Sequence, residues 1–283
     1  MGEALMGKID LKVSASIVLY ENDRREVEHV IHCCLQATEI GKLYLIDNSR
    51  ENKQQEYTFD ERICYVHNGR NLGFGAAHNV AITASINNFD YHIVVNPDIT
   101  FEPHIISVMV SYMEEYTNIG SLMPKILYPD GELQRLCKLL PNPLNLFARR
   151  FGIPGAWRKL INSKYELQMF DYNQIVDIPN LSGCFMFIRT AVLKKVGGFD
   201  ERYFMYLEDV DLVRRIGREA RTVFFPSVSV YHAYQKASYK NLKMLKFHVV
   251  SAIKYFNKWG WVFDKERKEK NRDTLLRLES KQR

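Results

Sequence analysis

The segment Glu208-Asp209-Val210-Asp211 brings three carboxylates together at the start of a stretch in which apolar residues recur with helical spacing. A carboxylate can take the proton from a hydroxyl nucleophile, and the aromatic residues of segment 199–206 could raise its pKa into the range of a general base. The same acids would also stabilise the first turn of a helix, where the helix dipole favours negative charge. The local pattern therefore predicts a general base, with a helix cap as the alternative.

Two further acids follow apolar, strand-like segments. Asp98 ends Asn96-Pro97-Asp98, directly after the segment 91–95, and its carboxylate could hold Mg²⁺ or Mn²⁺ against substrate phosphates. Asp47 follows the segment 42–46 and could accept hydrogen bonds from a nucleobase or a ribose. Because Asn, Asp and Pro are strong turn formers, both positions are also open to a purely structural interpretation as turns.

A glycine-rich segment and a histidine complete the set of candidates. Asn71-Leu72-Gly73-Phe74-Gly75 precedes a helix expected at about 76–86, and a helix N-terminus favours anions. Its spacing matches neither the dinucleotide-binding fingerprint nor the phosphate-binding loop that ends in Lys-Ser/Thr. His232 follows the apolar segment 228–231 and could bind a metal or donate to a phosphate, although a structural histidine is the more common case.

These candidates lie in a chain whose first half alternates short apolar segments with helix-like ones. The alternation predicts an α/β fold with a mostly parallel central sheet and helices on both faces. In such sheets ligands bind beyond the carboxyl ends of the strands, which is where Asp47, Asn71 and Asp98 fall. Strands are expected at 14–20, 42–46, 63–66, 91–95, 184–188 and 222–225, and helices at about 27–38, 76–86, 208–218 and from about 240 onward.

The bulk composition fits a protein with a sizeable core, since 46% of the 283 residues are hydrophobic. No apolar run reaches the roughly 18–20 residues of a membrane span, and the N-terminus has no signal-peptide core, so the protein is expected to stay in the cytoplasm. Residues 236–283 carry 14 Lys and Arg against 5 Asp and Glu, and of the net charge of +6 this leaves about −3 for the rest. The basicity belongs to the C-terminus, and no nucleic-acid partner is expected.

Taken in order, the motifs resemble those of family-two glycosyltransferases with the GT-A fold, especially bacterial rhamnosyltransferases that build O-antigen and other cell-surface polysaccharides. The resemblance covers about residues 14–235. It implies a GT-A catalytic domain over 1–235, with a nucleotide-sugar-binding half at about 12–125 and an acceptor-binding half at about 126–235, and then a basic helical C-terminal extension over 236–283. The motifs that carry it are Ser16–Tyr20, Ile46–Ser49, Asn71–Gly75, Asn96–Asp98, Leu181–Cys184, Gly198–Glu201, Glu208–Asp211 and His232.

The resemblance implies separate roles for the three clustered acids. Asp209 would be the general base that deprotonates the acceptor hydroxyl, Glu208 would orient the acceptor, and Asp211 is expected to cap the helix. A single carboxylate base with no covalent intermediate means direct displacement at the anomeric carbon, which inverts its configuration.

The remaining motifs would bind the donor and a metal. Asp98 and His232 would hold a divalent cation, Mg²⁺ or Mn²⁺, against the donor diphosphate. Asn96 stands where the family often has the first acid of Asp-x-Asp, so the cation would have one carboxylate fewer. The residues that would bind the donor are Tyr20, Asp47, Asn71, Gly73, Asn96 and Asp98.

The expected function is inverting transfer of L-rhamnose from dTDP-rhamnose to a glycan or a lipid-linked glycan. The alternatives are a UDP-hexose or galactofuranose donor and, more remotely, a nucleotidyltransferase or a non-catalytic sugar-nucleotide-binding module. The Gln-x-x-Arg-Trp motif of processive synthases is absent, which favours non-processive transfer. The basic C-terminus and the arginine-rich segment 147–159 are expected to contact an anionic membrane, on the inner face of the cytoplasmic membrane. The aromatic cluster in 255–263 could belong to a homodimer interface or to the core.

Overall fold

The computed structural model describes residues 12–147, 163–233 and 242–280. The arginines of the segment 147–159, for which a membrane contact was expected, lie outside these residues. In the described part of the chain no helix is long and apolar enough to cross a membrane.

The described strands form one nine-stranded sheet in the order β3-β2-β1-β4-β8-β6-β9-β5, with β7 paired to β9. Six of them, β3, β2, β1, β4, β6 and β9, run in the same direction, so the prediction of a mostly parallel sheet is confirmed. The antiparallel β8 joins the two parallel groups. The strands are β1 Val13–Leu19, β2 Ile40–Asp47, β3 Ile63–His67, β4 Tyr91–Val95, β5 Ile99–Thr100, β6 Ile119–Leu127, β7 Val176–Asp177, β8 Phe185–Arg189 and β9 Arg221–His232.

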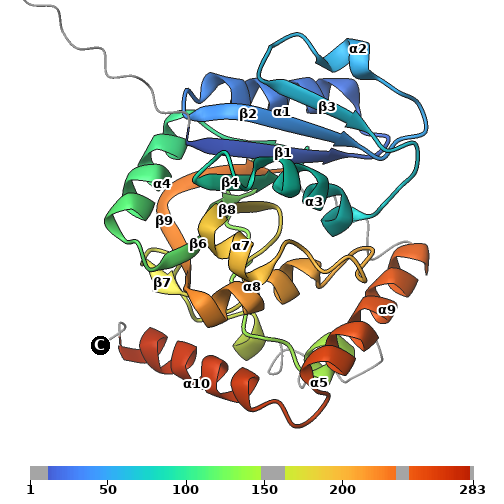
Figure 1. Ribbon diagram of the computed structural model, residues 1–283. Helices are drawn as coiled ribbons and strands as arrows, with labels where there is room; N and C mark the ends of the chain where they lie inside the picture. The colour runs from blue at the N-terminus through green and yellow to red at the C-terminus, as the bar shows by residue number, and fades with distance from the viewer. Residues whose placement is uncertain (1–11, 148–162, 234–241, 281–283) are drawn as a thin grey trace, which may run out of the picture.

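Helices cover both faces of this sheet (Figure 1). Because successive residues of a strand point to opposite faces, β2 shows both layers. Tyr44 and Ile46 pack with apolar residues of α3, whereas Leu43 and Leu45 belong to the cluster that includes the apolar side of α1. The helices are α1 Arg24–Gln36, α2 Gln54–Tyr57, α3 Phe74–Ser85, α4 His104–Glu115, α5 Pro143–Phe147, α7 Thr190–Val196, α8 Glu208–Glu219, α9 Leu242–Trp259 and α10 Lys265–Ser280.

The strand β9 is longer than the sequence pattern predicts. It joins the expected strand 222–225 to the apolar segment 228–231, and its pairing with β6 shifts register beyond Phe225. A proline is compatible with a strand at such an irregularity, and Pro226 occupies this position. The continuous strand carries His232 back to the edge of the sheet where β5 begins.

The C-terminal helices α9 and α10 follow one another, joined by a turn, across the end of the molecule that also holds α5 and α8 (Figure 1). Tyr255 and Phe256 of α9 are fully buried in a second hydrophobic cluster, together with Leu207 and Val210 at the start of α8. These aromatic residues are therefore core, whereas Phe263 in the turn after α9 is 91% exposed. The basic extension thus packs directly on the acidic motif.

Candidate active site

Asp47 is held at the carboxyl end of β2, where it is almost fully buried. The Tyr65 hydroxyl donates to Asp47 Oδ2 at 2.5 Å, and the backbone N–H of Ser49 donates to Oδ1 at 2.7 Å. Burial, together with this carboxylate, raises the pKa of Tyr65. Each carboxylate oxygen keeps a second lone pair, so Asp47 can still accept a hydrogen bond from a ligand in a fixed orientation.

Asn71 and Gly73 shape the loop between β3 and α3. Asn71 Oδ1 accepts the Gly73 N–H at 2.9 Å, and Asn48 Nδ2 donates to the Gly73 carbonyl at 3.2 Å. Gly73 has a φ of +88°, and a Cβ there would lie 2.2 Å from the carbonyl oxygen of Phe204. Phe74 N–H donates to this same carbonyl at 3.0 Å. Glycine is therefore required because the loop between β3 and α3 touches the chain just before the acidic motif.

Tyr20 stands apart from these residues. It follows β1 at the same edge of the sheet, is 48% exposed, and lines an open hollow of about 420 Å³ with Glu21, Arg50 and Glu51. Arg50 adds a cation at this edge that sequence reasoning did not single out.

Asp98 and His232 come together where β5 pairs with β9. His232 Nε2 lies 3.3 Å from Asp98 Oδ1, and Nδ1 donates to Gln134 Oε1 at 3.0 Å. Burial lowers the pKa of His232, but the Asp98 carboxylate and the Cys184 thiol outweigh it and raise the pKa to about 10. Asp98 and Gln134 thus fix the orientation of the imidazole ring.

The residues around Asp98 fit an oxygen-ligated cation. Asn96 Oδ1 is buried and accepts no hydrogen bond from the described residues, and Asp98 Oδ1 has only its ion pair with His232. Unsatisfied buried oxygens of this kind are the ligands that Mg²⁺ and Mn²⁺ take, with substrate phosphates completing the shell. No group of three or more His, Cys, Asp or Glu side chains gathers within the described ranges, so a cage made by the protein alone is not found there.

The acidic motif forms the first turn of α8. Tyr206 and Leu207 enter it with φ values of 69° and 67°, which are strained for residues other than glycine. Asp209 Oδ2 accepts the Gly183 N–H at 3.0 Å, and Oδ1 accepts the Val210 N–H at 2.8 Å. A Cβ on Gly183 would lie 3.0 Å from the Asp209 Cβ, which explains the glycine in this motif.

A cavity of about 200 Å³ opens in front of these acids. Glu208 and Asp209 line it together with Lys138, Ser182, Tyr206 and His248. Glu208 is 5% exposed, and its Oε2 has no hydrogen-bond partner among the described residues. A buried acceptor of this kind is available to a bound hydroxyl group.

Different surroundings act on the pKa values of the two neighbouring acids. Burial raises the pKa of Glu208 well above its ordinary value, and the adjacent Asp209 adds to the shift. Burial also raises the pKa of Asp209, but the Val210 and Gly183 N–H groups and the Lys138 ammonium oppose it. The hydrogen bonds and the cation thus favour the charged carboxylate at Asp209.

Comparison with known proteins places the chain in a family. The model of the family "Glycosyltransferase like family 2" matches residues 47–248. The chain belongs to this family. It is 31% identical over 175 residues to an N-acetylglucosaminyl-diphospho-decaprenol L-rhamnosyltransferase of Mycobacterium tuberculosis, over 58% of this chain and 56% of the relative. It is 26% identical over 197 residues to the rhamnosyltransferase WbbL of Escherichia coli, covering 65% and 69% of the two chains.

Solved structures confirm the GT-A type of fold for this glycosyltransferase. GalNAc-T7 with UDP, GalNAc and Mn²⁺ superposes with a TM-score of 0.60 at 14% identity, over 86% of this chain and 47% of that one. TarS of S. aureus, residues 1–349, gives a TM-score of 0.56 at 16% identity, over 86% and 65%. The chain spans about 56% of the length of the mycobacterial relative, so that match covers only part of the relative.

One expectation from the sequence is wrong, because Asp211 does not cap the helix. Leu207 is the N-cap residue of α8, and no side chain caps it. Asp211 instead lies inside the first turn, fully buried, and is bonded to Arg215, Lys258 and Trp259. The acid meets cations and an indole from a distant part of the chain, which the local sequence could not show.

Two further residues of the candidate site were not found from the sequence. Gln134 holds His232 from both sides, since its Nε2 also donates to the His232 carbonyl at 2.7 Å. Lys138 lines the cavity in front of Glu208 and Asp209, and its charge opposes the rise in the pKa of Asp209. Both residues lie in a loop of no regular pattern, so no spacing signal pointed to them.

Proposed function

We propose that this glycosyltransferase moves a sugar from a nucleotide donor to a glycan or lipid-linked glycan hydroxyl, with inversion and with Asp209 as the general base. The observation that carries the proposal is the position of Asp209 in a cavity of about 200 Å³ whose entry segment touches the donor loop at Gly73. The acceptor oxygen would attack the anomeric carbon and lose its proton to Asp209. The bond from that carbon to the diphosphate would break, and its electron pair would leave with the nucleoside diphosphate.

The other residues divide the work between donor and acceptor. Asp47, Asn71 and Gly73 would bind the nucleoside part of the donor. Glu208, protonated and buried beside the base, would donate a hydrogen bond that orients the acceptor. His232 and a cation held by Asp98 would stabilise the charge that develops on the leaving diphosphate.

The two rhamnosyltransferases among the relatives support dTDP-rhamnose as the donor, and the first of them is named for a diphospho-decaprenol acceptor. A UDP-hexose or a galactofuranose nucleotide is the alternative donor. A panel of dTDP-rhamnose, UDP-glucose, UDP-GlcNAc and UDP-galactofuranose, assayed for release of nucleoside diphosphate, separates these alternatives. We expect dTDP-rhamnose to give the highest kcat/KM, and a chelator to abolish turnover until Mg²⁺ or Mn²⁺ is restored. A higher value for a UDP-sugar would overturn the assignment of the donor.

A surface on α9 and the turn after it supports docking of the protein on an anionic membrane. Exposed apolar residues lie along the outer side of α9 and in the turn after it, whereas His248 of α9 lines the base cavity. The stretch 242–280 carries ten Lys and Arg against five Asp and Glu. Apolar residues among cations are typical of surfaces that dock on anionic lipid. The exposed apolar residues are Leu242, Val250, Ile253, Val262 and Phe263.

Sedimentation with lipid vesicles tests this surface. We expect the protein to pellet with phosphatidylcholine vesicles that contain phosphatidylglycerol and to stay in solution with phosphatidylcholine alone. Phe263→Ser should weaken binding about tenfold or more, since one buried aromatic side chain contributes about 1.5–3 kcal/mol. The matched control is Phe59→Ser, because Phe59 is also exposed but follows α2 in the N-terminal half. If Phe263→Ser instead dissociates a dimer and leaves vesicle binding unchanged, the surface is a homodimer interface.

A further inference from the structure

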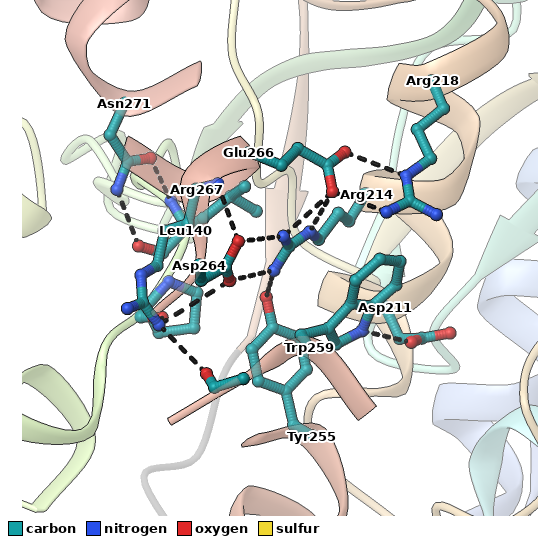
Figure 2. Close-up of polar contacts among 12 residues, drawn as sticks. Leu140, Asp211, Arg214, Arg218, Tyr255, Trp259, Asp264, Glu266, Arg267 and Asn271 are labelled. Atoms are coloured by element: carbon teal, nitrogen blue, oxygen red, sulfur yellow. Dashed lines mark hydrogen bonds and ion pairs between the residues drawn. The ribbon is translucent and has the colours of Figure 1, made fainter. Parts of the chain in front are cut away.

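Asp211 connects α8 to the C-terminal helix α9. It is two residues from Asp209 and fully buried. Trp259 Nε1 donates to Oδ1 at 2.8 Å, and Lys258 Nζ lies 2.7 Å from the same oxygen (Figure 2 shows the indole contact). Arg215 Nε donates to Oδ2 at 2.8 Å from the next turn of α8. Two of the three partners of this carboxylate thus come from the last turn of α9.

The same helix holds the segment that leads into the base. Ser251 Oγ donates to the carbonyl of Met205 at 2.7 Å, directly before the two residues with positive φ. Lys258 Nζ donates to Asp200 Oδ2 at 2.8 Å, so this ammonium group links a residue before the base to Asp211 after it. Strained backbone persists only where its surroundings fix it, and α9 supplies the contacts that fix it here.

Arg214, in the second turn of α8, bonds the segment at the start of α10. Its guanidinium donates to both oxygens of Asp264, at 2.8 and 2.6 Å, and to Glu266 at 3.0 Å (Figure 2). The guanidinium also lies 4.1 Å from the centroid of the Trp259 ring. Trp259 therefore contacts the first and the second turn of α8. Its N–H donates to Asp211, and its ring face lies against Arg214.

We infer that Lys258 and Trp259 are positioning residues, which hold the Asp209 carboxylate in line with the acceptor by gripping Asp211. The inference deepens the proposed function and rests on Asp209 being the base. The Asp209 carboxylate accepts the Gly183 and Val210 N–H groups, and it directly follows the strained Tyr206-Leu207 segment and Glu208. A displacement of about 1 Å at a reacting group can cost about 10²-fold in rate, so loss of the Asp211 contacts should appear in turnover.

Trp259→Phe is the direct test, because phenylalanine keeps an aromatic ring at this position but has no N–H to donate to Asp211. We expect kcat to fall about tenfold with little change in the KM for the donor, as for a misplaced catalytic group. The matched control is Trp261→Phe, which removes the indole N–H that donates to Asn257 at 2.8 Å from the turn after α9. This control should leave kcat and KM within about twofold.

A second pair of variants distinguishes positioning from stability alone. Lys258→Met should lower kcat, and Lys258→Arg should restore most of it, because arginine can bridge Asp200 and Asp211 again. Turnover is measured well below the melting temperature of each variant, so a loss of folded protein does not enter kcat. Wild-type kcat in both Trp259→Phe and Lys258→Met would overturn the positioning role. Retained transfer in Asp209→Asn would instead overturn the proposed function on which this role depends.

Discussion

Replacing Asp209 with Asn is expected to abolish sugar transfer while leaving the donor bound. The asparagine side chain has nearly the same shape but cannot accept a proton at neutral pH, and general-base catalysis contributes on the order of 10²–10⁴-fold to rate. Donor affinity should persist because Asp47, Asn71 and Asp98 lie on other elements. The measurement is kcat with the donor identified by the nucleotide-sugar panel, together with the Kd of the matching nucleoside diphosphate by calorimetry.

The matched control for this variant lies on the same helix. Glu219 is exposed at the end of α8, so Glu219→Gln removes a carboxylate of α8 without touching the cavity. Its kcat should equal that of the wild type. Asparagine offers only one acceptor oxygen to the two N–H groups that Asp209 binds, so a melting curve must show that the variant is folded. Transfer at more than a tenth of the wild-type rate would exclude Asp209 as the base.

The sequence predicted the sheet because its signals are local. The segments ending at Asp47 and at Asn96 are short apolar runs bounded by turn residues, and β2 and β4 lie where they were expected. The strand β6 was not predicted, and it contains Pro124, a residue that argues against a strand in an isolated sequence. Pro124 fits because the pairing of β6 with β9 shifts register directly after it. This irregularity belongs to the pairing of two distant segments, which periodicity cannot reveal.

The site shows the same division between local and distant contacts. Spacing predicted that Asp98 follows a buried strand and that Asp209 begins a helix, and both positions are confirmed. The glycine at position 73 was attributed to a ligand, but the close contact that requires it is with the Phe204 carbonyl. Asp211 was expected to cap a helix and instead binds Trp259. In both cases the partner comes from a part of the chain more than 45 residues away, and no local pattern encodes it.

The contact between Gly73 and Phe204 joins the loop between β3 and α3 to the segment before the acidic motif. The two segments share one backbone hydrogen bond, from Phe74 N–H to the Phe204 carbonyl at 3.0 Å. Tyr206 and Leu207, whose positive φ values strain this segment, follow shortly after Phe204. The segment before Asp209 is thus bonded to the loop between β3 and α3 through Phe204 and to α9 through Met205.

The packing of the C-terminal helices on α8 should contribute to the stability of the fold. Arg214→Met is the variant with the largest expected loss of stability. The side chains of Arg214 and Asp264 are 1% and 3% exposed. Removing the cation leaves the Asp264 carboxylate buried with only contacts from Arg267, and breaking a buried pair in this way costs about 3–5 kcal/mol. The free energy of unfolding, measured by urea titration at pH 7, should fall by that amount.

Arg218→Met is the matched control, because Arg218 also pairs with Glu266 and lies over the Trp259 ring but is 52% exposed. An exposed ion pair contributes about 0–1 kcal/mol, so this variant should be close to the wild type. Although burial raises the pKa of Asp264, Arg214 outweighs it and lowers the pKa below 3.8. Stability from a lowered carboxylate pKa is present above the ordinary pKa and is lost as pH falls through the lowered one. The difference in free energy of unfolding between wild type and Arg214→Met should therefore shrink at acid pH. Equal losses of stability in Arg214→Met and Arg218→Met would show that the burial of Arg214 does not stabilise the packing of the C-terminal helices.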